Sequence, residues 1–334
     1  MRTDDAGLRH ADAATRPKRR PDKVKVAFFI VLAIVLGGLA AGGVYAWTLW
    51  NSFNEKTVLD EAFPDDVDRP AAVEGAQTFL LLGSDSRSGA GSGDLGRADT
   101  IMVAHVPADH GTVQVMSIMR DNWVPIPGHG ERKINAATAL GGIPLMVQTV
   151  ESILDTRIDH VAIIDFESFK GLTSAVGGVT VDNPKAFKTV SGQRFEAGTI
   201  TLEGDDALAF VRERKAFAKG DYQRAANQQL LVKGLISKVL SAETLTNPGR
   251  LSALVSEVSP FLTTDAGLDA GYITGFAVAL KDIRANDVRF FTSPTLGTGT
   301  IKGQSIVKPD WDGLAQISQA IKDGTLGEYE PSGK

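Results

Sequence analysis

Residues 160–181 read HVAIIDFESFKGLTSAVGGVTV and decide the fold class. His160–Asp165 has the pattern of a strand, and Phe166–Val176 has the pattern of a helix. Val179–Val181 then returns as a short strand after the glycine pair at 177–178. Because strand, helix and strand follow one another directly, the stretch favours an α/β domain with a sheet covered on both faces.

The same alternation continues on both sides of this stretch. Further strands are predicted at Gln77–Gly83, Ile101–Val106, Thr112–Ile118, Val288–Thr292 and Gly299–Ile306. Further helices are predicted at Gly142–Leu154, Leu202–Val211, Asp221–Leu240, Pro248–Pro260, Leu268–Lys281 and Trp311–Lys322. No internal repeat and no break in composition follows residue 76. We therefore expect a single α/β/α layered domain with a mixed central sheet over residues 76–334.

The overall composition excludes several classes of function. The 334 residues are 43% hydrophobic and 22% charged, as in a globular protein, and the net charge of −5 argues against a general nucleic-acid binder. The absence of cysteine excludes disulfides, thiolate chemistry and cysteine-based zinc sites. The five histidines are scattered without ligand spacing, which speaks against a histidine-based metal site or catalytic triad.

The amino-terminal fifth has the pattern of a membrane anchor. Six lysines and arginines lie within residues 16–25, and residues 26–50 then contain no charged residue. As a helix, this stretch would be about 38 Å long, which is enough to cross a bilayer. Trp47 and Trp50 fall where an interfacial aromatic belt is expected. A cleavable signal peptide is the alternative, but its apolar region is normally about 7–15 residues long.

The excess of positive charge before the apolar stretch sets the expected orientation. Residues 1–25 are predicted to be a cytoplasmic basic tail, 26–50 a single transmembrane helix and 51–75 an extracytoplasmic stalk. The stalk segment contains several carboxylates and two prolines, which suit an exposed connection. The protein is thus expected in the cell membrane, with its main domain, residues 76–334, outside the cytoplasm.

Residues 210–229, FVRERKAFAKGDYQRAANQQ, bring three arginines together: Arg212, Arg214 and Arg224. A guanidinium stays charged at any pH that a protein meets and offers five donors in a fixed fork, so its usual task is to bind phosphate or carboxylate. Two interpretations remain open from these residues alone. The stretch forms an anion site, or it forms an internal cluster of ion pairs.

The helix after Gly220 indicates which of these side chains point inward. At 100° per residue, Asp221, Arg224 and Gln228 continue the apolar stripe, whereas Asn227 and Gln229 fall on the solvent side. Charged groups on an inward face must be paired or must bind a ligand.

The loop after the first predicted strand is rich in glycine and charge. It reads GSDSRSGAGSGDLGRADT over residues 83–100, and loops that leave the carboxyl ends of strands are common ligand sites. Asp85 and Asp99 form a carboxylate pair suited to a hard divalent ion such as Mg²⁺. A polar surface loop without function is the alternative. Arg120 ends the third predicted strand, and Lys133 follows a proline-rich turn.

Seven short motifs, in this order, resemble those of the LytR-CpsA-Psr family, and the resemblance covers residues 77 to about 240. They are Gly-x-Asp-x-Arg at 83–87, Arg-x-Asp-Thr at 97–100, Ser-Ile-x-Arg-Asp at 117–121, Lys-Ile-Asn-Ala at 133–136, Gly-Gly-Val-x-Val at 177–181, Val-Arg-x-Arg at 211–214 and Asp-x-x-Arg-x-x-x-Gln-Gln at 221–229. The resemblance implies a membrane-anchored phosphotransferase. Such an enzyme moves a glycopolymer with its linking phosphate from a polyprenyl-pyrophosphate carrier to peptidoglycan.

The resemblance also implies roles for the matching residues. Asp85 and Asp99 would hold Mg²⁺ or Mn²⁺. The groups implied to bind the pyrophosphate are Arg97, Arg120, Lys133, Arg212, Arg214, Arg224 and Gln228. Those implied to act in catalysis are Asp99, Arg120, Arg212 and Arg214, and Asp121 is a second candidate to accept a proton. Arg87 matches the first motif and is given less weight.

Two positions depart from the family pattern. Met119 stands where the family commonly has proline, and Asn227 stands where it commonly has arginine. Since Asn227 is expected to face solvent, we expect its identity to leave the pocket intact. Two other functions remain open: a hydrolase that acts on the same lipid with water as the acceptor, and a non-catalytic sensor that binds envelope lipid. Residues 1–25 contain no pattern of a folded signalling unit, which weakens the sensor.

Overall fold

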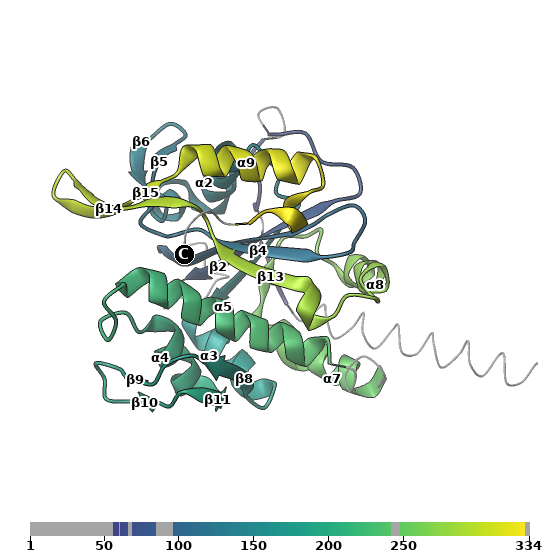
Figure 1. Ribbon diagram of the computed structural model, residues 1–334. Helices are drawn as coiled ribbons and strands as arrows, with labels where there is room; N and C mark the ends of the chain where they lie inside the picture. The colour runs from purple at the N-terminus through teal and green to yellow at the C-terminus, as the bar shows by residue number, and fades with distance from the viewer. Residues whose placement is uncertain (1–55, 60, 66–68, 85–95, 242–247, 331–334) are drawn as a thin grey trace, which may run out of the picture. The chain divides into compact units, whose positions relative to one another are not determined.

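A computed structural model describes residues 56–59, 61–65, 69–84, 96–241 and 248–330 (Figure 1). The predicted tail, the predicted anchor, Asp85 and Arg87 lie outside these residues. The seven strands of the main sheet are arranged in the order β1 (Thr57–Val58), β12 (Thr263–Thr264), β7 (His160–Asp165), β2 (Gln77–Ser84), β3 (Ala98–Val106), β4 (Val113–Ser117) and β13 (Val288–Thr292). β2 runs parallel to β7 and antiparallel to β3, and β4 runs parallel to β13. The mixed central sheet is as predicted.

Alternating side chains of the strands build a core on each face of this sheet. Leu80 and Leu82 of β2 pack with helices α2 (Ala136–Leu154) and α9 (Trp311–Lys322) on one face. Leu81, between them, packs on the other face, where α5 (Gly220–Val239) lies. Figure 1 shows α2 and α9 above the sheet and α5 below it. The α/β/α layering therefore follows from the nearly continuous apolar run of β2.

A further layer lies on the far side of α5. It consists of the two-stranded sheet β8 (Val179–Asn183) and β11 (Gly198–Leu202), the hairpin β9 (Phe187–Lys188) and β10 (Arg194–Phe195), and the helices α3 (Phe166–Ala175) and α4 (Gly204–Arg212). At Gly234 of α5, a Cβ would lie only 2.5 Å from the Thr180 carbonyl oxygen, so only glycine permits this close approach. The helix α5 is consequently covered on two sides.

The prediction that Asn227 and Gln229 of α5 face solvent is wrong, because this helix is covered on two sides. Asn227 is 1% exposed and donates from Nδ2 to the Phe210 carbonyl at 3.1 Å. Gln229 is half-buried and donates from Nε2 to Ser117 Oγ and to the Phe291 carbonyl, both at 2.9 Å. A helical wheel assigns one buried stripe, whereas a helix between two layers buries polar residues on a second side as well.

Two hairpins depart from the predicted elements. The predicted strand Gly299–Ile306 is in fact two strands, β14 (Thr295–Ile301) and β15 (Gln304–Pro309), which turn at Lys302–Gly303. Both turn residues have positive φ, as a tight hairpin turn requires. The predicted proline-rich turn is partly a strand, because β5 (Trp123–Ile126) pairs with β6 (Gly130–Lys133).

The remaining helices are α7 (Pro248–Val258) and α8 (Ala270–Ala279), with 3₁₀ turns at Ser259–Phe261, Ala285–Asp287 and Leu326–Glu328. Among the helices that the structure describes, α2 is long and apolar enough to cross a membrane by length and composition. Most of that stretch is buried, and its backbone leaves the helical conformation at Gly141 and Gly142. It is therefore a core helix.

The described residues between 56 and 75, predicted to form an exposed stalk, are in part exposed and in part packed against the domain. β1 pairs with β12 at the edge of the main sheet, and Ala62 belongs to the main core. The Arg69 side chain, 5% exposed, donates to Glu151 of α2 at 2.7 Å. The acidic composition suggested an exposed connection, but the few apolar residues of this segment are enough to hold it against the domain.

Candidate functional site

A cavity of about 1600 Å³ opens at one edge of the main sheet, where β4 and β13 end and β3 begins. The hairpins β5–β6 and β14–β15 form part of its wall, and the loop before α5 closes another side. Eight of its lining residues are lysine or arginine, whereas four are aspartate or glutamate. This excess of positive charge favours an anionic ligand.

Arg120 is positioned by the turn that follows β4. The Ile118 amide donates to the Ile101 carbonyl at 2.8 Å, and the Asn122 amide donates back to the Met119 carbonyl at 2.9 Å. Met119 is buried against Ala225 of α5 and Val307 of β15. The methionine that replaces the usual proline therefore anchors the turn by packing, which leaves Arg120 facing the cavity.

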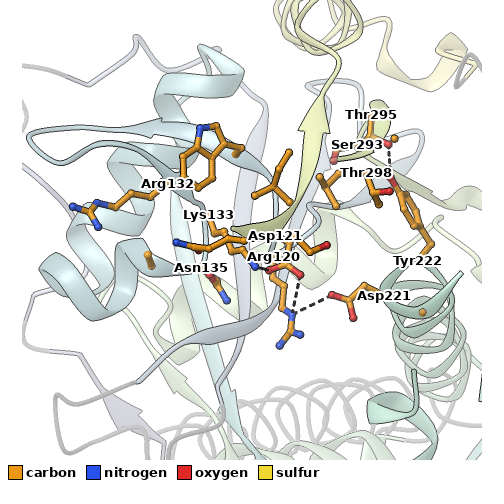
Figure 2. A pocket seen from close by; sticks show the side chains of 18 of the residues that line it. Arg120, Asp121, Arg132, Lys133, Asn135, Asp221, Tyr222, Ser293, Thr295 and Thr298 are labelled. Carbon is orange, nitrogen blue, oxygen red and sulfur yellow. Dashed lines mark hydrogen bonds and ion pairs between the residues drawn. The ribbon is translucent and has the colours of Figure 1, made fainter. Parts of the chain in front are cut away.

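Arg120 is the centre of an ion-pair cluster, shown in Figure 2. Its Nη1 donates to Asp99, and its Nε lies 3.3 Å from Asp221 Oδ2. Lys133 Nζ lies 2.9 Å from Asp121 Oδ1. Burial acts to lower the pKa of Arg120, but its hydrogen bond to the Asp99 carboxylate and the charges of the nearby carboxylates outweigh burial and raise that pKa. Arg120 is thus a fixed positive charge in the cavity.

Asp221, at the start of α5, joins the arginines to one another. Its carboxylate is 3.7 Å from Arg214 Nη1 and 3.4 Å from Arg224 Nη2, in addition to its contact with Arg120. Burial acts to raise the pKa of Asp221, but the charges of these arginines, that of Arg224 foremost, hold the pKa below its ordinary value. Three guanidinium groups therefore converge on one carboxylate.

The structure brings together most of the residues predicted from the sequence. Six of them line the cavity: Arg97, Asp99, Arg120, Asp121, Lys133 and Arg214. Arg224 is buried behind Asp221, with its side chain 9% exposed.

Arg212 and Gln228 are not among the residues that line this cavity. The Arg212 guanidinium lies 4.3 Å from the centre of the Phe166 ring and faces a smaller hollow of about 510 Å³. That hollow also contains Glu213, whose carboxylate accepts from the amides of Val190 and Ala216 at 3.0 Å. Arg212 lines only this hollow, whereas Arg214 lines both the hollow and the cavity.

The sequence did not indicate the residues that the hairpins contribute. Trp123 and Arg132 come from β5–β6, whereas Thr295, Thr298 and Gln304 come from β14–β15. Tyr222 was detectable, because it lies between Asp221 and Arg224 in the same motif. Its hydroxyl is 2.8 Å from Thr295 Oγ1 and links α5 to β14.

Of the two predicted metal ligands, only Asp99 lies within the described residues, because Asp85 is outside them. Within the described ranges there is no group of three or more histidine, aspartate or glutamate side chains placed to hold a metal ion. The Asp99 side chain is 22% exposed and lines the cavity, and a carboxylate has lone pairs for both Arg120 and a cation. The residue is thus suited to a divalent ion.

The chain was compared with known proteins. Residues 49–323 match the model of the LytR_cpsA_psr family. The cell wall biosynthesis protein LcpA of Corynebacterium glutamicum is 33% identical over 98% of this chain and 69% of its own length. The polyisoprenyl-teichoic acid–peptidoglycan teichoic acid transferase TagU of Bacillus subtilis is 32% identical over 92% of this chain and 98% of its own length.

The fold is also similar to that of a solved structure whose sequence is related. The crystal structure of B. subtilis TagV superposes with a TM-score of 0.65 at 25% identity, covering 77% of this chain and 99% of that one. The family model spans most of the sequence and both sequence relatives exceed 30% identity. The chain therefore belongs to the LytR-CpsA-Psr family, as its seven motifs predict.

Proposed function

We propose that this protein transfers a glycopolymer, together with its linking phosphate, from a polyprenyl-pyrophosphate carrier to peptidoglycan. The observation that supports this most strongly is the cationic cavity around Arg120. A pyrophosphate diester carries two negative charges, and the cavity offers Arg120, Lys133 and Arg214 around one opening. The name of TagU, which is similar over nearly the full chain, describes a transfer of this class.

The reaction is a phosphoryl transfer that needs positioning and charge rather than covalent help from the protein. An acceptor hydroxyl oxygen bonds to the phosphorus that carries the glycan, and the bond from that phosphorus to the bridging oxygen breaks. Polyprenyl phosphate leaves with the bridging oxygen. The guanidinium groups of Arg120 and Arg214 stabilise the charge on the equatorial and leaving oxygens, because they are held in place before the substrate arrives.

The proton of the acceptor hydroxyl needs a base within the cavity. Asp99 and Asp121 both line it, and each is paired with a cation, Asp99 with Arg120 and Asp121 with Lys133. A carboxylate oxygen close to the acceptor hydroxyl can accept its proton as the oxygen–phosphorus bond forms. We assign this role to one of the two.

A divalent cation, Mg²⁺ or Mn²⁺, would be held by Asp99 with Asp85. It would supply further charge neutralisation at the phosphates. The apolar stretch 26–50 would anchor the chain in the cell membrane, with the domain on the outer side, where a lipid carrier and peptidoglycan meet.

The test uses the full chain in detergent or vesicles, with labelled lipid-linked glycan, Mg²⁺ and peptidoglycan. We expect label on peptidoglycan. Label released as a soluble phosphosugar would instead identify a hydrolase, and lipid that stays bound and unchanged would identify a sensor. Arg120→Ala should lower the transfer rate by about 10²–10³-fold, the typical loss when a preorganised donor is removed.

The matched control is Arg289→Ala, because Arg289 is an arginine of β13 whose side chain is 50% exposed and contacts Glu330 outside the cavity. This variant should keep full activity. Full activity of Arg120→Ala would overturn the assignment of the cavity.

A further inference from the structure

We infer that the hairpin β14–β15 beside the cavity, together with Trp123 at the start of the neighbouring hairpin β5–β6, forms a subsite for the acceptor glycan. This inference rests on the proposed transfer reaction and names where its second substrate binds. The side chains that carry it are Trp123 on one hairpin and Ser293, Thr295, Thr298 and Gln304 on and beside the other.

The cavity has two chemically different sides. Residues 292–307 contribute hydroxyl, amide and apolar groups, and Lys302 at the hairpin turn is the one charged residue in this part of the lining. The other charged lining residues come from the start of β3, from β5–β6 and the turn before it, and from residues 214–221. Figure 2 shows Thr295 and Thr298 on one side of Arg120, and Arg132 and Lys133 on the other.

This wall fits a diphosphate less well than the cationic side does, because Lys302 is its single positive charge. It does fit a sugar chain, whose hydroxyl and acetamido groups are both donors and acceptors. Serine, threonine and glutamine side chains also have both capacities. Trp123 adds a half-buried indole, with an apolar face for sugar C–H groups and one N–H donor.

The wall is fixed before any ligand binds, and its anchors lie next to Arg120. The Val307 amide donates to the Asp121 carbonyl at 2.9 Å, and the Ile134 amide donates to the Asn122 carbonyl at 2.8 Å. The Tyr222 hydroxyl meets Thr295 at 2.8 Å. Both hairpins are therefore tied to the turn that carries Arg120, which lowers the entropy cost of ordering a bound glycan.

The arrangement also suits the chemistry. In phosphoryl transfer, the attacking and leaving oxygens lie roughly in line on opposite sides of the phosphorus. A carrier diphosphate on the cationic side and an acceptor sugar on the neutral side would approach the phosphorus from different directions. The acceptor hydroxyl would then reach the phosphorus beside Arg120 and Asp121.

The test is the double variant Thr298→Val, Gln304→Leu, in which both positions are exposed at the surface of the hairpin. With the full chain, saturating lipid-linked donor and soluble peptidoglycan fragments, we expect the KM for the fragments to rise about tenfold, as for two lost hydrogen bonds. The Kd for the donor lipid should stay within about twofold. The matched control is Leu296→Thr, since Leu296 lies on β14, is 68% exposed and does not line the cavity.

A direct binding measurement keeps the inference separate from the proposed reaction. Fragments added to the wild-type chain, without donor, should change the fluorescence of Trp123, and the change should be absent in Trp123→Phe. This result would support the subsite even if no transfer is detected. An unchanged KM in the double variant, weakened donor binding in its place, or no binding of fragments to the wild-type chain would each overturn the subsite.

Discussion

The molecule contains two arginine–carboxylate clusters that differ in how completely they are closed. Arg69 and Glu151 lie 5% and 2% exposed in the core, and their nearest atoms are 2.7 Å apart. Glu151 also accepts from the Ile158 amide at 2.8 Å, and Arg69 also donates to the Ile158 carbonyl. Both carboxylate oxygens of Glu151 and the Nε and Nη2 atoms of Arg69 have partners inside the protein, so this pair is closed.

The cluster around Arg120 is open by comparison. Arg120 and Asp221 are each 16% exposed, and three cations reach Asp221 at distances of 3.3–3.7 Å. These contacts are long for charge-assisted hydrogen bonds, which are typically about 2.7–2.9 Å. Three guanidinium groups that share the Asp221 carboxylate at long distances beside a cavity form a site that an anion can complete. A short, closed pair in the core is part of the scaffold.

The largest expected effect comes from breaking the closed pair. Glu151→Ala leaves Arg69 buried without its partner, and losses of about 3–5 kcal/mol in the free energy of unfolding are typical of such a change. Urea unfolding of the variant and the wild type measures the loss. Inorganic pyrophosphate should not restore the stability, because no anion reaches this position. A loss below about 1 kcal/mol would show that the pair is not a structural one.

Acid unfolding distinguishes a third buried group, His105, from both clusters. Burial lowers the pKa of His105 to about 4, from an ordinary value of 6.5. The unfolded chain binds a proton on His105 more readily than the folded chain does. The free energy of unfolding is therefore highest above about pH 6.5 and decreases as the pH falls to about 4. A shift of this size corresponds to about 3 kcal/mol.

The variant His105→Gln should therefore lose less stability than the wild type between pH 6.5 and 4, as measured by thermal unfolding at each pH. The pKa of Asp221 is lowered, so this carboxylate keeps its charge through that window and titrates below it. Equal slopes for the variant and the wild type would contradict the assignment to His105.

The sequence was sufficient to predict the charged residues of the site and most strands of the main sheet. Arg120, Lys133 and Arg214 stand in short contiguous motifs, and strands such as His160–Asp165 have a strong local pattern. The roles of these charged residues could be assigned because the motifs that contain them resemble those of the family.

The rest depends on contacts between distant segments, which a local pattern does not contain. Asn227 was misplaced because the wheel gives an angle but not the number of layers around a helix. The hairpin β14–β15 was missed as a pair because β14 alternates threonine and glycine with few apolar residues. Arg69 was assigned to a stalk because its partner, Glu151, is 82 residues away.

The open cluster should respond to ligand where the closed one does not. Asp221→Asn removes the carboxylate on which three guanidinium groups converge, and we expect a loss of about 2 kcal/mol at pH 7, less than for the closed pair because Asp221 is partly exposed. Inorganic pyrophosphate should raise the Tm of this variant more than that of the wild type. Equal protection of Asp221→Asn, Glu151→Ala and the wild type would remove the distinction between the two clusters.

The smallest effect tests the boundary between site and scaffold on α5. Asn227 lies three residues from Arg224 in the same motif, yet its Nδ2 donates to the Phe210 carbonyl and not into the cavity. Asn227→Ala leaves that carbonyl unpaired, so we expect a loss of about 1–2 kcal/mol in stability. The transfer rate per folded molecule should be unchanged. If the rate fell at least tenfold while the stability stayed constant, Asn227 would belong to the site, and the second buried side of α5 would have a role in binding as well as in packing.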